Sequence, residues 1–206
     1  MAKNKEAPED LLDIAVVGDI TDREAEICDK LLAVPPGGEC TMYFDSPGGS
    51  AYTAVSLLTL IVIRELRVTG IVTGECSSAA LWPLAACCRR IVTPFSVLLF
   101  HPLKWQSEEH IGLSEAAEWA RHFGKLEKDM DKLLAQYFGT EESRIAEWMT
   151  PGRYVTGTEM VAAGLAEMLD LSALANRSAA TGASRRASAP GPVSGKAIGR
   201  NRHGGP

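Results

Sequence analysis

Acidic residues are missing from the last part of the chain, and this absence divides the sequence in two. From Ser172 to Pro206 there are six Lys and Arg residues and no Asp or Glu, so this segment carries +6. The whole chain of 206 residues carries −5, which leaves −11 on residues 1–171. Binding to phosphate groups depends on clustered Lys and Arg. We therefore do not expect nucleic acid to be the main substrate of the acidic part.

The basic segment also has little that could form a core. Most of residues 172–206 are Ser, Ala, Gly, Pro or Arg. This composition cannot bury enough apolar surface to offset the entropy lost on ordering, so we predict a disordered tail. Residues 1–10 are mostly polar, and we predict that they form a disordered lead-in. The remaining residues, 11–171, have an ordinary length for one domain.

Long apolar runs and paired cysteines are absent as well. Ala54–Ile63, the longest strongly apolar run, is far too short to cross a bilayer, and residues 1–10 lack the apolar core of a signal peptide. The five cysteines are odd in number and have no C-x-x-C spacing, which indicates neither a disulfide framework nor a zinc site. A reducing compartment fits these thiols. We therefore expect a cytoplasmic protein with no membrane contact and no metal.

Strands and helices alternate through residues 11–171. Apolar and β-branched runs predict strands at 12–17, 41–44, 68–73, 90–93, 97–100 and 153–155. Helical periodicity and helix start and stop signals predict helices at 21–34, 50–66, 77–88, 113–137, 140–149 and from 156 to about 163. The first and last of these helices each begin with a predicted capping box. This order is typical of an α/β fold in which βαβ units surround a largely parallel sheet.

A Ser46-Pro47-Gly48-Gly49 turn separates a predicted strand from a predicted helix. The two glycines can form a tight turn that needs positive φ angles, which glycine adopts without strain. They can also present a backbone N–H group to an oxyanion near a helix N-terminus. A phosphate-binding P-loop is excluded because no Gly-Lys-Ser/Thr follows.

Ser77 and Ser78 lie among small residues that join a strand to a helix. One serine can cap that helix, while the other can be a nucleophile whose small neighbours let a reactant approach. His101 follows the apolar strand 97–100 and is the candidate base. A hydroxyl, a base and backbone N–H donors are together what acyl transfer by a serine requires.

With these motifs in this order, the sequence from about Asp13 to Asp170 resembles the proteolytic subunit of the Clp protease, a ClpP-like serine peptidase. The resemblance implies a ClpP/crotonase-like fold of repeated ββα and βαβ units with a long handle helix. Aligning S-P-G-G with the elbow without a gap places the family nucleophile on Ser78 and the oxyanion-hole N–H groups on Gly49 and Ala79. His101 matches the general base.

The same resemblance implies a serine-type endopeptidase that cleaves peptides or unfolded proteins by acyl-enzyme chemistry. It also implies homo-oligomeric rings and no cofactor. The family has an N-terminal segment that meets an AAA+ ATPase partner, and the short lead-in here leaves that partner open. Residues 104–109 lack the glycines of the family's substrate-groove strand, so the peptide preference could differ.

The main departure is at Gly152, where the family has the aspartate that completes the catalytic triad. Such a carboxylate holds the histidine in the correct tautomer and stabilises its imidazolium form. Another acid such as Glu75 or Glu147, a backbone carbonyl or a water could orient His101 instead, or the site could be slow or inactive. On the sequence alone, Gly152→Asp is expected to raise activity.

Three other interpretations share the general fold. A serine–lysine peptidase would use Lys125 or Lys128, and a crotonase-like acyl-CoA enzyme would use Glu75 with the paired glycine N–H groups. A weak or inactive ClpP-like subunit would serve as a scaffold or regulator in a ring beside active subunits. The absent aspartate favours this subunit as the second interpretation.

Overall fold

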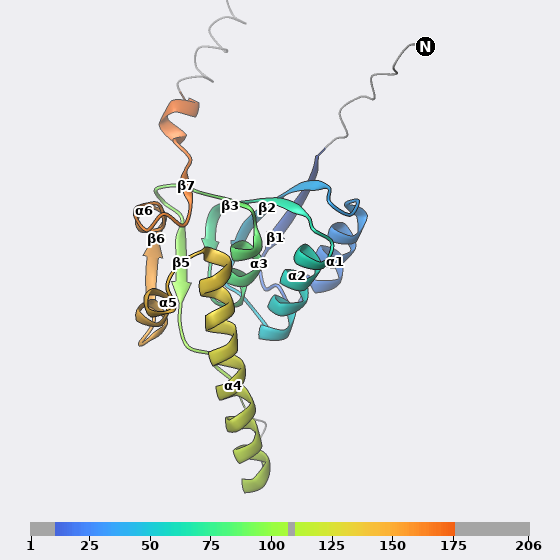
Figure 1. Ribbon diagram of the computed structural model, residues 1–206, viewed down its shortest axis with the longest axis vertical. Coiled ribbons are helices and arrows are strands. Elements are labelled where there is room, and N and C mark those ends of the chain that lie inside the picture. Colours follow the sequence, from blue (N-terminus) through green and yellow to red (C-terminus); the bar gives the residue numbers. More distant parts are fainter. Residues whose placement is uncertain (1–10, 107–109, 176–206) are drawn as a thin grey trace, which may run out of the picture. The chain divides into compact units, whose positions relative to one another are not determined.

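The computed structural model describes residues 11–106 and 110–175, and the chain divides into two units, Met1–Leu169 and Asp170–Pro206 (Figure 1). In the described part of the second unit, residues 171–175 form a helical turn. Ala173 N donates a hydrogen bond of 3.0 Å to Asp170 Oδ1 at its start. The predicted lead-in (1–10) and the predicted tail from residue 176 lie outside the described residues.

The described residues of the first unit contain a sheet of seven strands. The strands are β1 (Leu12–Val17), β2 (Glu39–Ser46), β3 (Arg67–Cys76), β4 (Arg89–Val92), β5 (Val97–Phe100), β6 (Arg153–Thr156) and β7 (Glu167–Met168). Strands β1, β2, β3, β4 and β7 pair in that order, and all these pairs are parallel. β5 pairs in parallel with the end of β3, and β6 runs antiparallel to β5. The predicted α/β fold with a largely parallel sheet is confirmed.

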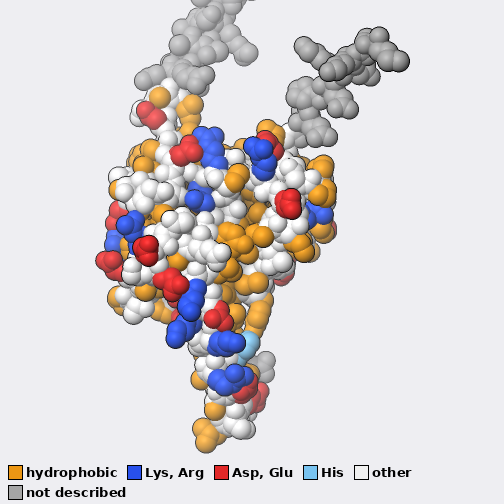
Figure 2. All heavy atoms as spheres, viewed as in Figure 1, with side chains coloured by type: hydrophobic (Ala, Val, Ile, Leu, Met, Phe, Trp, Pro, Cys, Tyr) orange, Lys and Arg blue, Asp and Glu red, His pale blue; other side chains and the backbone are white. Residues whose placement is uncertain are grey.

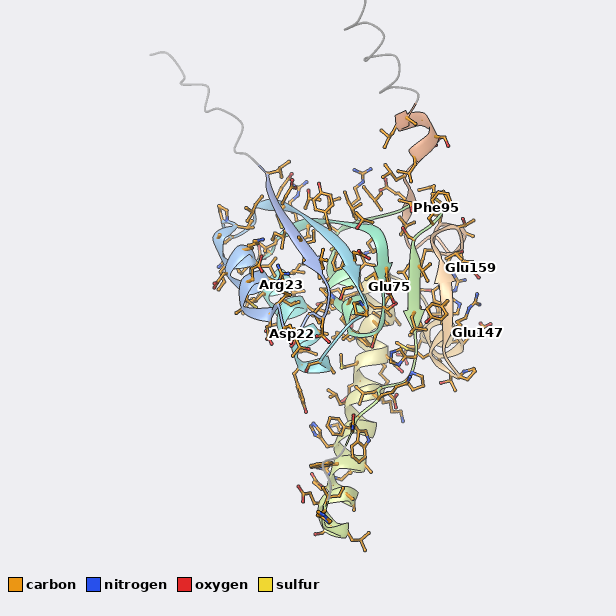
Figure 3. All side chains as sticks on the ribbon, turned by 180° about the vertical axis from the view of Figure 1, so that it is seen from behind. Asp22, Arg23, Glu75, Phe95, Glu147 and Glu159 are labelled. Atoms are coloured by element: carbon orange, nitrogen blue, oxygen red, sulfur yellow. The ribbon has the colours of Figure 1, made fainter. Side chains whose placement is uncertain are left out.

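Helices cover one face of this sheet. α1 (Glu24–Ala33), α2 (Ala51–Ile63) and α3 (Leu81–Ala86) lie on the same side of it, as the two opposite views show (Figures 1 and 3). Burial alternates along β1, where Ile14 and Val16 are fully buried and their neighbours are not. This period of two follows because successive side chains of a strand point to opposite faces.

The parallel arrangement brings three distant segments to one edge of the sheet. β2 ends at the S-P-G-G turn, β3 ends at the serine elbow, and β5 ends just before His101. Because β2, β3 and β5 run in the same direction, their carboxyl ends lie at the same edge. Ligand sites of open α/β sheets lie at such an edge.

One of the two predicted capping boxes is wrong. α1 begins at Glu24 without a side-chain cap, because the Thr21 hydroxyl accepts a hydrogen bond from Ser50 N (2.7 Å) instead. The Glu24 carboxylate accepts from Thr53 Oγ1 (2.7 Å), so it also serves a contact with α2. The second predicted box, which starts α6 (Gly157–Ala162), is present and confirmed.

The long helix α4 (Leu113–Phe138) has buried residues only in its second half and is followed by α5 (Glu142–Met149). Its buried residues are Met130, Leu134, Ala135 and Phe138. The first half extends beyond the sheet (Figure 1), and Leu113 at its free end is 89% exposed. Figure 2 shows hydrophobic atoms at this end and charged side chains along the helix. None of the helices in the described ranges is both long and apolar enough to span a membrane.

Candidate active site

The S-P-G-G turn packs directly against the serine elbow. Buried Ser46 holds the turn, since its Oγ donates to Gly18 O (2.6 Å) and accepts from Gly48 N (3.1 Å). Gly48 has a φ of +109°, and a Cβ placed on it would lie 2.7 Å from Ser78 Cβ and 3.0 Å from Ala79 N. Any larger residue would push the turn away from the elbow, so both the conformation and the close approach require glycine.

The two serines of the elbow have different surroundings. Ser77 is buried, and its Oγ accepts a hydrogen bond from Leu99 N (3.1 Å), which ties β5 to the elbow. Ser78 begins the short 3₁₀ helix η1 (Ser78–Ala80) with a φ of +53°. This is an uncommon angle for a residue with a side chain, and such angles concentrate at functional turns. Of the two, Ser78 lines a cavity and Ser77 does not.

The cavity has a volume of about 390 Å³ and brings together the residues that the sequence suggested. Ser78, His101, Gly49 and Ala79 all line it, although they come from three separate segments. Among the described residues, no acceptor bonds the N–H group of Gly49 or that of Ala79. These two are therefore available to bind a negatively charged oxygen.

His101 is held by a backbone carbonyl. Its Nδ1 forms a hydrogen bond of 2.6 Å with the carbonyl oxygen of Pro102. A carbonyl oxygen can only accept, so Nδ1 carries the proton in this arrangement. Nε2 of the neutral ring then has a free lone pair, which is the tautomer that a general base needs.

Gly152 lies beside His101, as the resemblance implied for the third triad position. A Cβ on Gly152 would lie 3.1 Å from His101 Cβ and 3.2 Å from Phe100 O. The alternative acids are elsewhere: Figure 3 shows Glu75 on β3 and Glu147 on α5, and neither bonds to His101 in the described part of the chain. Among the predicted ways of orienting the ring, the backbone carbonyl is therefore the one with a contact in the structure.

Two carboxylates of α4 also line the cavity. Glu127 Oε1 accepts a hydrogen bond of 2.6 Å from Leu103 N. Burial raises the pKa of Asp131 to about 6, and the nearby carboxylate of Glu127 adds to this rise. No group of three or more His, Cys, Asp or Glu residues that could hold a metal ion occurs within the described ranges.

An aromatic wall lines the cavity on the side of α4, with Trp105 and Phe123 among the lining residues. Trp105 stacks on Phe123 with ring centroids 6.0 Å apart and meets Trp119 edge-on at 5.4 Å. Tyr52 lines the cavity from α2, and its hydroxyl is 2.8 Å from His122 Nε2.

Comparison with known proteins identifies the family. The Clp protease family model matches residues 9–169. The chain belongs to the Clp protease family. It is 27% identical over 115 residues to proteins named ATP-dependent Clp protease proteolytic subunit from two strains of Bacteroides fragilis, ATCC 25285 and YCH46. The matched part is 55% of this chain and 55% or 51% of the relatives, so the chain spans about half the length of the curated relatives it matches.

Membership of the Clp protease family confirms the resemblance. The cavity also bears on the other interpretations. Lys125 and Lys128 are exposed on α4, and neither lines the cavity that contains Ser78. Glu75, which a crotonase-like mechanism would use, does not line it either. The residues that these two mechanisms were expected to use therefore do not line the cavity, where Lys104, Glu127 and Asp131 are the lysine and the acids present.

Sequence reasoning missed the aromatic wall and the carboxylates of α4. The charges of this helix resembled an ordinary solvated face, and residues 104–106 were notable only for lacking glycine. The contacts of Trp105 and Glu127 join residues 14 or more positions apart. No local pattern reports such a contact, so only the helix periodicity of α4 could be seen beforehand.

Proposed function

We propose that this Clp protease family member is a serine-type endopeptidase that cleaves peptides or unfolded proteins through an acyl-enzyme. Ser78 Oγ attacks the peptide carbonyl carbon while His101 Nε2 takes the hydroxyl proton. The N–H groups of Gly49 and Ala79 bind the oxyanion of the tetrahedral intermediate. His101 then gives the proton to the leaving amine as the C–N bond breaks, and a water hydrolyses the acyl-enzyme by the same route.

One observation carries this proposal: Ser78, His101 and two unbonded backbone N–H groups line a single cavity, with His101 held in the tautomer of a base. Each group alone has an ordinary structural explanation. Their convergence from the ends of three parallel strands does not.

Without a carboxylate at Gly152, we expect a lower rate than that of a complete triad. In serine proteases, replacing the triad aspartate by an amide costs about 10⁴ in rate because the wrong tautomer forms. Here the carbonyl of Pro102 keeps the correct tautomer but offers a partial charge. We therefore expect a loss smaller than 10⁴ relative to a complete triad.

The experiment is labelling of the full chain with a fluorophosphonate probe, followed by mass-spectrometric assignment of the modified residue. We expect modification of Ser78 and none in Ser78→Ala. Ser77→Ala is the matched control: it should keep the label and lose thermal stability, because the bond from Leu99 N is removed. Absence of label in the wild-type protein, or its persistence in Ser78→Ala, would refute the proposal.

Assembly and location are part of the same proposal. The exposed first half of α4 and the family membership support a homo-oligomer of rings, with the cytoplasm as the compartment. Stimulation of protein degradation by an added AAA+ unfoldase and ATP would separate a degradative enzyme from a stand-alone peptidase.

A weak or inactive ring subunit is the second candidate, and Gly152 is the observation that favours it. In that case the protein should co-purify with a second Clp-like subunit that takes the fluorophosphonate label, while this chain remains unlabelled.

A further inference from the structure

The peptide group between Pro102 and Leu103 is bonded at both ends. Its carbonyl oxygen accepts from His101 Nδ1 (2.6 Å), and its N–H group donates to Glu127 Oε1 (2.6 Å). Imidazole, peptide and carboxylate thus form one continuous hydrogen-bonded chain. Both distances are slightly shorter than the usual range for N–H···O hydrogen bonds.

A peptide group transmits polarisation because resonance joins its N–H and C=O groups. When the N–H group bonds to an anion, electron density moves toward the carbonyl oxygen, which becomes a better acceptor. Such cooperativity strengthens neighbouring hydrogen bonds by roughly 10–30% in condensed phases. The negative charge of Glu127 therefore favours the proton on His101 Nδ1 and favours the positive ring that forms during catalysis.

Glu127 is well placed for this role. It lies one helical turn before Met130, which is buried and whose carbonyl accepts from Trp82 Nε1 (3.0 Å), so this part of α4 is held against α3. Glu127 is partly buried, and its carboxylate forms no ion pair with any described residue. The hydrogen bond from Leu103 N is therefore the contact through which this charge acts.

Position 152, where the family has its aspartate, leaves no easy place for a carboxylate. Gly152 has a φ of +107°, and a side chain there would begin only 3.1 Å from His101 Cβ. The Pro102 carbonyl reaches the ring because Pro102 follows His101 directly. The carboxylate of Glu127 on α4 can then stabilise the ring through the peptide group that follows Pro102.

We propose that Glu127 is a positioning residue that replaces the missing triad aspartate and acts on His101 through the Pro102–Leu103 peptide group. This inference rests on the proposed function of Ser78 and His101. It assigns to α4 a role in the chemistry of the site in addition to packing.

The test compares Glu127→Gln, Glu127→Leu and the control Glu118→Gln in the full-length protein. Gln keeps an oxygen that can accept from Leu103 N but lacks the charge, whereas Leu removes both. With a fluorogenic peptide, we expect kcat to fall about tenfold in Glu127→Gln and about a hundredfold in Glu127→Leu, with KM within about twofold. Glu118, an exposed residue of the same helix paired with Arg121, should tolerate the change.

A second readout does not depend on turnover. The chain has four histidines, so ¹⁵N-histidine labelling with His101→Gln for assignment reports the tautomer of His101. We expect the Nδ1–H form in the wild type, an increased share of the Nε2–H form in both Glu127 variants, and an upfield shift of the Leu103 amide proton. A merely structural contact would leave the tautomer of the Gln variant unchanged.

The outcomes separate cleanly. Glu127→Gln with wild-type kcat overturns the inference, and so does a loss of kcat with an unchanged tautomer of His101. If the wild-type protein has no turnover and no label at Ser78, the proposed function fails. The tautomer measurement then still decides whether Glu127 acts on His101.

Discussion

Ser78 has a backbone conformation that is costly for a residue with a side chain, about 1–3 kcal/mol for such angles. The neighbouring Gly48 accommodates it, since a Cβ at that position would collide with Ser78 Cβ. Ser77 supplies the hydrogen bond that anchors the elbow to β5. At the residue scale, Ser77 therefore ties the elbow to β5 and Gly48 leaves room for it, while Ser78 is the serine that lines the cavity.

Gly152 shows why a missing residue cannot simply be restored. The sequence alone suggests that Gly152→Asp would complete a triad, but a φ of +107° and the contact with His101 Cβ make any side chain strained. We now expect this variant to lose thermal stability by about 1–3 kcal/mol and to show no gain in kcat/KM. Thermal unfolding and peptide hydrolysis measure both.

The control for Gly152→Asp is Gly112→Asp. Gly112 is the N-cap of α4 and a Cβ there meets nothing within 4 Å, so an aspartate should be neutral or stabilising. A Gly152→Asp protein that is as stable as the wild type and more active would show that the structure relaxes to accept the carboxylate.

At the scale of elements, α4 combines two different halves. Its second half packs on the unit, and its middle brings Glu127, Met130 and Asp131 to the cavity. Trp105, in the loop that precedes the helix, stacks on Phe123 of the helix. The helix therefore serves both as a wall of the cavity and as an arm that extends from the sheet.

The partly buried Asp131 of α4 should make the stability of the protein depend on pH. Asp131 has a pKa of about 6 in the folded protein, against 3.8 as its ordinary value. Between these values the unfolded chain loses a proton that the folded chain keeps, so stability falls as pH rises from about 4 to 6. We expect Asp131→Asn to be more stable than the wild type by about 1 kcal/mol at pH 7.5, a value reduced for partial exposure, and to match it near pH 4.

Urea unfolding at pH 4, 5, 6 and 7.5 tests the contribution of Asp131. Asp129→Asn is the matched control, because Asp129 is exposed on the same helix. If the free energy of unfolding changed with pH in the same way for Asp131→Asn and the wild type, Asp131 would titrate as an exposed acid does.

At the scale of the whole molecule, the exposed arm of α4 requires an explanation. Residues 113–129 include no buried residue, and Leu113 at the free end is almost fully exposed. Isolated helical segments of this length are marginal in water unless an apolar face is covered. A second copy of the chain, as proposed for the ring assembly, would cover it.

Leu113→Glu tests that assembly. We expect a lower mass by size-exclusion chromatography with light scattering, because a charge would be buried between copies. Ser114→Glu, which adds the same charge at the next exposed position, should retain the mass of the wild type. Unchanged mass in Leu113→Glu would place the interface elsewhere.

Much of the fold could be predicted from the sequence because it depends on local patterns. The bounds of β1 and β5 agree with the apolar runs, and α4 ends next to Gly139, whose positive φ stops the helix. The capping box at Thr21 was wrong because its hydroxyl bonds to Ser50, 29 residues away. β7 was missed because its two residues carry no pattern and pair only with β4.

The sequence by itself determined the order of the elements, the turn and the elbow, and its resemblance to the Clp protease family made Ser78 and His101 the candidates for nucleophile and base. Periodicity, glycine and capping signals act between near neighbours, so they can be read along the chain. Only the tertiary structure decided three hydrogen bonds of the site. Ser77 Oγ accepts from Leu99 N, the Pro102 carbonyl accepts from His101, and the Glu127 carboxylate accepts from Leu103 N. The contacts of Ser77 and Glu127 join residues 22 and 24 positions apart. The Pro102 carbonyl is next to His101 in the sequence, but the loop sets its direction. Packing of the sheet and α4 brings such partners together, and no local pattern records it.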